Sequence, residues 1–171
     1  MSTGERVPVR SLAGAPVSAE RFRAAMRGVP APVTVIAALT ATGAHATTVS
    51  AFSSLSLDPP LVLAALDGSS ELLATLVLHD RARFAVHVLG AGQEELARQC
   101  AEKRPDKLAS VRWTEREGVP CIEGGVAWLA CEVEDLVPAG DHVIVTGLVV
   151  ATEVHAAPAL AYRARRFHLV D

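Results

Sequence analysis

The sequence predicts a mainly β protein with some α-helix, built as a closed or nearly closed β-barrel with a few peripheral helices. Three observations favour this class. Most of the chain consists of apolar, β-branched or alternating segments, which are typical of strands. The segments with helical periodicity are short. Strands and helices do not alternate regularly, which argues against a doubly wound parallel sheet.

The N-terminal segment, residues 1–16, contains two glycines and two prolines and has no hydrophobic periodicity. We expect a loose arm there, and an ordered arm that packs on a partner subunit is the alternative. Residues 17–171 are predicted to form one domain, because a chain of 171 residues has the size of a single domain.

A first helix is predicted to begin at Ser18, because a serine side chain accepts a hydrogen bond from a free backbone N–H of the first turn. Phe22, Met26 and Val29 share one face of this helix by their spacing of three or four residues. Pro30 then ends the helix, because proline has no N–H to donate.

Most of the remaining chain is predicted to be strand. The segment 61–66 is apolar on both faces, so we expect it to be buried. Residues 127–134 alternate between an apolar and a more polar face and predict a half-buried strand. Gly147 lies within a long strand and indicates a bulge or a close approach by another group. Short helices are expected at 71–79 and 93–103, and strands at 33–39, 47–60, 61–66, 84–89, 127–134, 142–154 and 160–169.

The composition excludes several classes of protein. Half of the residues are hydrophobic and 20% are charged, a mixture that forms a packed core rather than a disordered chain. The net charge is −3, so no basic field predicts nucleic acid or an anionic membrane as a partner. No run approaches the ~20 apolar residues of a membrane-spanning helix.

The thiols, histidines and glycines carry none of the standard site motifs. The three cysteines include no Cys-x-x-Cys pair, and residues 1–16 lack the apolar core of a signal peptide, so we expect a cytoplasmic protein with reduced thiols. The six histidines are dispersed, and no metal site is expected. The glycines form neither a P-loop nor a dinucleotide-binding Gly-x-Gly-x-x-Gly motif.

The segment 47–60, with the sequence TTVSAFSSLSLDPP, is the first candidate for a functional site. As one extended strand it places Thr48, Ser50, Ser54 and Ser56 on the same face as Phe52. Hydroxyls and backbone N–H groups are suited to hold a phosphate or the polar edge of a heteroaromatic ring. A solvated strand face that is rich in serine and threonine is the alternative.

Two further segments are short. Gly140 and Asp141 suit a tight turn, and His142 opens the next strand, where its imidazole is expected at a barrel mouth or is an ordinary exposed histidine. Ser69 and Ser70 follow Asp67 at a predicted helix N-terminus, where they bind an anion or only cap the helix. His87 lies between apolar residues and is predicted to be a core histidine with satisfied hydrogen bonds.

These segments belong to a set of motifs that runs in order across nearly the whole chain. The motifs are Phe22-Arg23-x-Ala25-Met26, Val33-Thr34-Val35-Ile36, residues 48–60, Leu61-Val62-Leu63, Phe84-Ala85-Val86-x-Val88-Leu89, Asp106-Lys107-Leu108, Ala127-Trp128-Leu129-x-Cys131, Gly140-Asp141-His142 and Arg165-Arg166-Phe167. A serine-rich strand that ends in Asp-Pro-Pro and is followed by Gly-Asp-His is specific as a pair. Together the motifs resemble the short-chain flavin reductase family.

The resemblance implies a split β-barrel with antiparallel Greek-key strands and an NAD(P)H-dependent flavin reductase activity. Such proteins are homodimers that bind FMN or FAD loosely, reduce it with NADH or NADPH and release the reduced flavin to a separate monooxygenase. This chemistry needs neither a metal nor a protein nucleophile, because the cofactors carry the hydride. A flavin-binding split-barrel module without turnover, a flavin enzyme that acts on an organic substrate and a structural barrel that binds nothing are the alternatives.

The resemblance also assigns residues to roles by position in the family motifs. His142 is expected beside the nicotinamide, as the one catalytic residue, through a polar contact with the carboxamide. The residues expected to line the flavin are Thr48, Val49, Ser50, Ala51 and Phe52, with Phe84, Ala85 and Val86 at the ring edge. Those expected near the ribityl phosphate are Asp67, Ser69, Ser70, Ala101 and Lys107, and those expected near the nicotinamide are Arg166 and Phe167.

The chain departs from the family pattern at several of these positions. Ala51 stands where a serine is common, which removes one hydroxyl from the expected flavin wall. His87 replaces a frequent asparagine, and Pro32 replaces a glycine before the first strand. These changes alter the expected ring contacts but not the expected fold.

Overall fold

A computed structural model describes residues 14–79, 81–104 and 106–171. Most of the predicted arm, residues 1–13, lies outside the described residues, so the division into an arm and a domain stays a prediction. The helices are α1 (Ala19–Met26), α2 (Glu71–Val77) and α3 (Glu94–Ala101). The strands are β1 (Ala31–Pro32), β2 (Thr34–Thr40), β3 (Gly43–Val49), β4 (Phe52–Leu57), β5 (Pro60–Asp67), β6 (Arg83–Val88), β7 (Trp113–Arg116), β8 (Val119–Ile122), β9 (Ala127–Ala139), β10 (His142–Val154), β11 (Ala159–Arg163) and β12 (Arg166–Val170).

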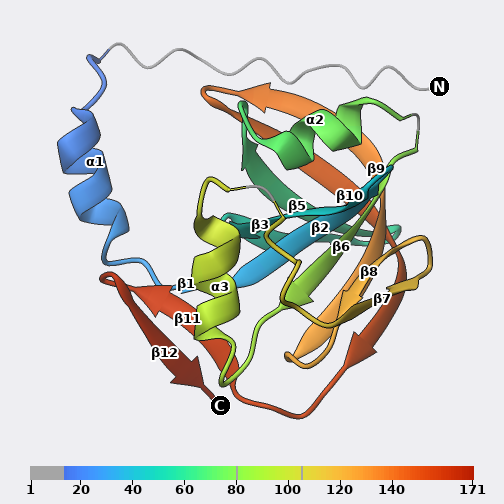
Figure 1. Cartoon of the computed structure of the whole chain (residues 1–171). Helices are drawn as coiled ribbons and strands as arrows, with labels where there is room; N and C mark the ends of the chain where they lie inside the picture. Colours follow the sequence, from blue (N-terminus) through green and yellow to red (C-terminus); the bar gives the residue numbers. More distant parts are fainter. Residues whose placement is uncertain (1–13, 80, 105) are drawn as a thin grey trace.

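The largest sheet has seven strands, which pair antiparallel in the order β3-β2-β6-β9-β10-β5-β4. β3 and β4 stand at opposite ends of this order, yet only Ser50 and Ala51 separate them in sequence. The sheet must therefore curl until its ends meet (Figure 1). The Ala65 N–H in β5 donates to the Ala51 carbonyl at 2.9 Å and ties this connection to the barrel. The predicted mainly β split barrel is confirmed.

The barrel interior is packed with apolar side chains. Phe84 of β6 is 1% exposed at the centre of this core. At Gly147 the register between β9 and β10 shifts, and an added Cβ would lie 2.5 Å from Cζ of Phe84. The predicted close approach at Gly147 is confirmed, because the Phe84 ring fills the space that a side chain would need. Helix α2 lies across one end of the barrel (Figure 1), where it buries Leu72, Leu73 and Leu76.

The outer face of β9 is covered by the hairpin β7–β8, which the sequence did not predict. Trp128 and Ala130 on that face are buried against Val119 of β8, while Cys131 faces the barrel interior. The prediction of a half-buried strand at 127–134 is therefore wrong for its first part. The reason is tertiary, because the covering residues come from a separate segment of the chain.

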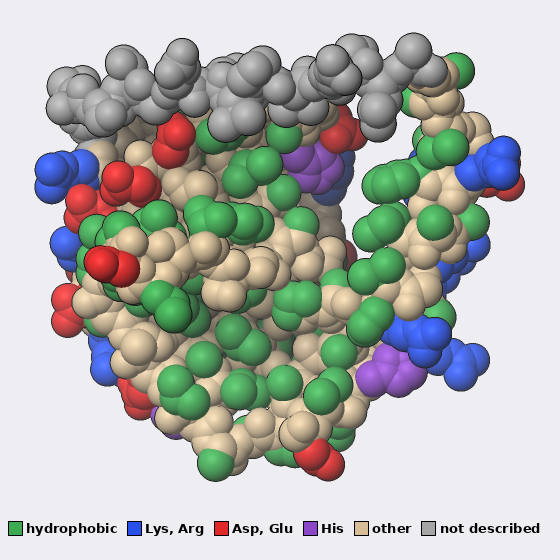
Figure 2. All heavy atoms as spheres, turned by 180° about the vertical axis from the view of Figure 1, so that it is seen from behind, with side chains coloured by type: hydrophobic (Ala, Val, Ile, Leu, Met, Phe, Trp, Pro, Cys, Tyr) green, Lys and Arg blue, Asp and Glu red, His purple; other side chains and the backbone are tan. Residues whose placement is uncertain are grey.

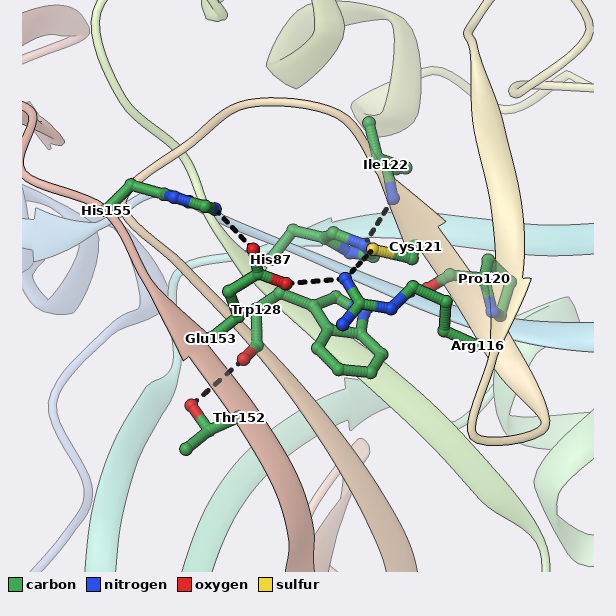
Figure 3. Close-up of polar contacts among 9 residues, drawn as sticks. All are labelled: His87, Arg116, Pro120, Cys121, Ile122, Trp128, Thr152, Glu153 and His155. Atoms are coloured by element: carbon green, nitrogen blue, oxygen red, sulfur yellow. Dashed lines mark hydrogen bonds and ion pairs between the residues drawn. The ribbon is translucent and has the colours of Figure 1, made fainter.

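Polar groups under this hairpin satisfy one another. The Ile122 N–H donates to Nε2 of His87 at 2.9 Å, so Nδ1 carries the proton and donates to the Val35 carbonyl at 3.2 Å. Burial lowers the pKa of His87 to about 4, so the ring is neutral. Figure 3 shows His87 beside Trp128, whose indole N–H donates to the Pro120 carbonyl at 3.2 Å. The prediction of a satisfied core histidine is confirmed.

Two predicted strands are interrupted. The segment 47–60 is not one strand, because the chain leaves β3 after Val49 and enters β4 at Phe52, at the other end of the sheet. The segment 160–169 is a hairpin of β11 and β12, which turns at Ala164 and Arg165 with φ of 51° and 64°. In both cases the strand pairing differs on the two sides of a short connection, which local periodicity does not reveal.

Helix α1 begins where expected, since the Ser18 hydroxyl accepts a hydrogen bond from the Arg21 N–H at 3.4 Å. The helix stands away from the barrel beside β11 and β12 (Figure 1), and none of its residues is buried. Phe22 and Met26 on its apolar face are 58% and 47% exposed. Figure 2 shows hydrophobic side chains along this helix, on the side that faces the barrel across a gap. No helix in the described residues is long and apolar enough to cross a membrane.

Candidate functional site

A cavity of about 410 Å³ opens between the start of β3, the turn from β5 into α2 and the end of α3. These three segments are far apart in the sequence, and the curled sheet brings them together because β3 forms one of its edges and β5 lies next to the other edge strand, β4. The lining residues are Ala44, His45, Ala46, Thr47, Asp67, Ser69, Ser70, Glu71, Leu72, Ala101, Glu102, Lys103, Arg104, Asp106 and Lys107.

One wall of the cavity is a tight turn at the end of β5. The carboxylate of Asp67 accepts from both the backbone N–H and the hydroxyl of Ser69, at 2.8 and 2.6 Å. These hydrogen bonds hold the pKa of Asp67 below its usual value, so the carboxylate is ionised at neutral pH. Ser70 occupies the N-cap position of α2, but its side chain makes no capping hydrogen bond.

His142 lies next to this turn. Its strand pairs with β5 so that His142 stands opposite Asp67, and the Gly68 N–H donates to the Asp141 carbonyl at 2.9 Å. Nδ1 of His142 is 2.8 Å from Oδ1 of Asp141, and this contact lowers the pKa of the Asp141 carboxyl. The His142 side chain is 43% exposed, and His142 is not among the residues that line the cavity.

The opposite wall is the end of α3 and the loop after it, which carries three cations. Nζ of Lys107 donates to the Cys100 carbonyl at 3.0 Å, and the amide of Gln99 donates to the Lys107 carbonyl. Arg104 pairs with Glu102 at 3.6 Å in an exposed ion pair. Lys103 lies close enough to lower the pKa of Asp67 across the cavity. This second wall therefore carries three cations and the two carboxylates Glu102 and Asp106, whereas the first wall carries Asp67, Glu71 and two serine hydroxyls.

His45 enters the cavity from β3, and Thr75 of α2 holds it. Nδ1 of His45 is 2.9 Å from the Thr75 hydroxyl, which donates in turn to the Glu71 carbonyl at 3.0 Å. Among the described residues, no group of three or more His, Cys, Asp or Glu side chains is placed to hold a metal ion.

Comparison with known proteins identifies the family. The Flavin reductase like domain family matches residues 26–171. The NADH:riboflavin 5'-phosphate oxidoreductase of Streptomyces pristinaespiralis is 34% identical over 171 residues, covering 97% of this chain and 94% of that protein. The chain belongs to the flavin reductase-like family. The resemblance predicted from the sequence motifs is confirmed.

Solved structures of flavin reductase-like proteins have the same fold. The Streptomyces globisporus C-1027 NADH:FAD oxidoreductase in complex with NAD and FAD fragments matches with a TM-score of 0.82 and 32% identity, over 91% of this chain and 96% of that one. The styrene monooxygenase flavin reductase of Pseudomonas putida S12 matches with a TM-score of 0.80 and 31% identity, over 88% and 97%. The chain spans only 42% of a probable flavin reductase of Rhizobium meliloti, to which it is 37% identical.

In this flavin reductase-like chain the expected wall of hydroxyls from Thr48 to Phe52 does not line the cavity. The Thr48 hydroxyl donates to the Ala97 carbonyl at 2.7 Å and holds α3 on β3, and Val49 is buried in the core. Ser50 and Ala51 are exposed in the connection between the two strands. The continuous hydroxyl face is a wrong prediction, because the strand on which it depended is broken there.

The expected ring-edge residues are closed off in this chain. Phe84, Ala85 and Val86 are each 1% exposed or less, so they offer no surface to a ligand. Phe167 packs beside α3 instead, with Tyr162 at 5.1 Å between ring centroids and the Arg98 guanidinium 5.0 Å above its ring. Arg166 is exposed at the start of β12 and does not line the cavity. The nicotinamide contacts of Arg166 and Phe167 stay predictions.

Five of the expected residues do line the cavity, namely Asp67, Ser69, Ser70, Ala101 and Lys107. Four polar lining residues were not predicted from the sequence, namely His45, Thr47, Lys103 and Arg104. Lys103 and Arg104 lie in a charged loop that has the composition of an ordinary surface loop. His45 and Thr47 alternate along β3 toward one face, a local signal that was present in the sequence.

Proposed function

We propose that the chain binds FMN or FAD in the cavity between β3, α2 and α3, reduces it with NADH and releases it to a monooxygenase. The NAD(P)H-dependent flavin reductase activity predicted from the sequence is confirmed, and the relatives that align over nearly their whole length are named for NADH. What supports the cavity as the flavin site is the pairing of an anionic, hydroxyl-bearing wall with a basic wall, beside His142.

The charges of the cavity set the direction in which the flavin lies. A phosphate fits the side of Lys103, Arg104 and Lys107, because cations offer charge-assisted hydrogen bonds to its oxygens. Ionised Asp67 repels a phosphate and accepts hydrogen bonds from ribityl hydroxyls. We therefore place Asp67 and Ser69 along the ribityl chain rather than at the phosphate, which modifies the expectation from the family motifs.

His142 stands opposite Asp67 in the pairing of β10 with β5, although it is not among the residues that line the cavity. When bound, the flavin accepts the hydride that the nicotinamide supplies, so the protein needs only to hold the two rings in contact and exclude water. The exposed imidazole of His142 contacts Asp141 through Nδ1, and its Nε2 would be the atom that contacts the carboxamide of bound NADH. Its role is binding and orientation rather than proton transfer.

The proposal includes a homodimer in the cytoplasm. A helix of eight residues is not stable by itself in water, so the apolar face of α1 needs a covering surface. A second copy of the chain is the partner that provides one, and it would also cover the exposed segment around Ser50 and Ala51. The contacts of Thr48, Val49, Ser50, Ala51 and Phe52 with flavin stay predictions for this dimer.

The proposed site is tested by steady-state oxidation of NADH with added FMN. The wild-type chain is expected to oxidise NADH at a rate that saturates with free FMN or FAD. Replacing Lys103 by Gln removes one cation of the basic wall and is expected to raise the KM for FMN about fivefold, with the kcat little changed. Arg112→Gln, a variant of an exposed arginine outside the cavity, is the control. A yellow protein without turnover would support a flavin-binding module instead.

A further inference from the structure

The loop that follows α3 at the cavity is fastened to the end of that helix by two hydrogen bonds that run in opposite directions. The side-chain amide of Gln99 donates to the Lys107 carbonyl, and Nζ of Lys107 donates to the Cys100 carbonyl at 3.0 Å. Gln99 is half-buried and is not among the residues that line the cavity. A side chain that fixes a lining residue in this way can act on the site through that residue.

Both N–H groups of the Gln99 amide are used. One donates to the Lys107 carbonyl, and the other donates to the Ser110 hydroxyl, which lies 3.2 Å from the same nitrogen. Leu108, between these two contacts, is buried in the apolar core. The segment from Lys107 to Ser110 is therefore held by Gln99 from the helix and by Leu108 from the core.

The Lys107 ammonium keeps hydrogen-bonding capacity for a ligand. An ammonium has three N–H groups, and one of them is used at the Cys100 carbonyl. That carbonyl belongs to the last turn of α3, where backbone carbonyls lack a helical partner. Among the described residues Lys107 pairs with no carboxylate, whereas Arg104 is paired with Glu102. Two N–H groups of a fixed cation are thus left at the cavity wall.

The position of each cation matters, because carboxylates outnumber cations in this cavity. The carboxylates are Asp67, Glu71, Glu102 and Asp106, and the cations are Lys103, Arg104 and Lys107. An anionic group is therefore held only where a cation stays close to it and the carboxylates stay away. A lysine that is already fixed on folding loses little further rotamer entropy when a ligand binds.

We propose that Gln99 is a positioning residue that holds Lys107 in place for the phosphate group of the flavin. The inference rests on the proposed flavin site in the same cavity. Gln99 fixes the Lys107 backbone from behind, and its effect on the ligand passes through the Lys107 ammonium. Without the amide donors the loop can move away from α3, and the phosphate loses a donor at a fixed place.

The test compares the affinities for FMN and riboflavin, which differ only in the phosphate, by quenching of flavin fluorescence. Gln99→Met keeps the length of the side chain and removes both donors. It is expected to weaken FMN binding about fivefold and to leave riboflavin binding unchanged, because only FMN uses the Lys107 ammonium. Steady-state kinetics should show a higher KM for FMN with an unchanged kcat. Gln99→Ala is the second variant in case Gln99→Met folds poorly.

A double-mutant cycle shows whether Gln99 acts through Lys107. Lys107→Met is expected to weaken FMN binding about tenfold. The double variant should then bind FMN no more weakly than Lys107→Met alone, because the group that Gln99 positions is already gone. Losses that multiply in the double variant would overturn the inference, since Gln99 would then act on the ligand by another route.

Gln93→Met is the matched control. Gln93 lies at the other end of α3, where its amide accepts from the Gly90 N–H at 2.9 Å and donates to the Glu123 carbonyl at 3.3 Å. It fastens a loop as Gln99 does, but at a distance from the lining residues. The ratio of FMN to riboflavin affinity should therefore stay at the wild-type value in this variant. Equal losses of FMN and riboflavin affinity in Gln99→Met, or no loss of either, would leave Gln99 a structural residue and overturn the inference.

Lys103→Gln and Lys107→Met separate failure of the inference from failure of the proposed site. If these variants weaken FMN binding relative to riboflavin and Gln99→Met does not, the cavity holds the phosphate without help from Gln99. If none of the three does so, the phosphate does not lie in this cavity, and both proposals fall. A higher KM for NADH with unchanged FMN affinity in Gln99→Met would also overturn the inference, because Lys107 would then serve the dinucleotide.

Discussion

Two regions of the barrel both contain histidine and basic side chains, but one region covers them and the other leaves them open. Under the β7–β8 hairpin, His87 uses both ring nitrogens in hydrogen bonds to the chain and is 2% exposed. At the cavity, His45 uses one ring nitrogen, and His142, opposite the lining residue Asp67, is 43% exposed. Figure 3 shows the closed region, where Arg116 covers Trp128 and pairs with Glu153.

The comparison shows that a polar side chain is structural where another element covers it and is open to a ligand where none does, whatever its residue type. Basic side chains exist on both sides, but Arg116 is engaged by Glu153 and Cys121, whereas Lys103 faces the cavity. Variants of the closed region should therefore change the free energy of unfolding and spare catalysis. Variants of the open region should change ligand binding and spare stability.

The largest effect is expected for His87→Ala. The change leaves the Ile122 N–H and the Val35 carbonyl without their partner and opens a hole in the core. We expect the free energy of unfolding in urea to fall by about 4 kcal/mol, with the kcat of the remaining folded protein unchanged. If the kcat of the folded variant falls together with its affinity for flavin, the closed region takes part in the site.

The second-largest effect on the free energy of unfolding is expected when the pH is lowered, through His87 of the closed region. The pKa of His87 is about 4 in the folded chain, below the value of about 6.5 expected when unfolded. The unfolded state therefore binds a proton that the folded state excludes, so this contribution is complete above about pH 6.5 and is lost as the pH falls toward about 4. We expect a loss of about 3 kcal/mol over that window. In His87→Gln the slope between those pH values should flatten, and an unchanged slope would assign it to other groups.

Gly147→Ala should come third. The new Cβ would lie 2.5 Å from Cζ of Phe84, so the ring or the strand must move. We expect a loss of about 2 kcal/mol in the free energy of unfolding. Gly28→Ala is the matched control, because its Cβ would meet only the Ala25 carbonyl at 3.5 Å. Equal stability of the two variants would mean that the barrel interior is looser than its packing indicates.

The smallest effect on stability is expected for His142→Ala, which tests the open region. Its side chain is 43% exposed and bonded only to the exposed Asp141, so the unfolding midpoint should stay the same. The KM for NADH should rise about tenfold through loss of the polar contact with the carboxamide. His155→Ala, at an exposed histidine of the closed region, should leave the KM for NADH unchanged.

Much of the fold could be predicted from local pattern. The strand 142–154 and the Ser18 helix start are where the sequence places them, and Gly147 marks a close approach as expected. The hairpin β7–β8 was missed, because its residues carry little alternation and gain their role only by covering Trp128. The break at Ser50 and Ala51 was missed because two good strand segments adjoin without a proline or glycine between them.

The residues of the site likewise divide into those that the sequence predicted and those that it did not. Asp67, Ser69 and Lys107 line the cavity as predicted, because their motifs are contiguous in the chain, and the role of His142 stays a prediction. His45, Lys103 and Arg104 were not, because their types and spacing are those of ordinary surface residues. By itself the sequence determined the family, the mainly β barrel and the turn that carries His142, since each depends on neighbouring residues. Only the tertiary structure decided which polar groups are covered and which remain open to a ligand, because covering depends on contacts between segments distant in sequence.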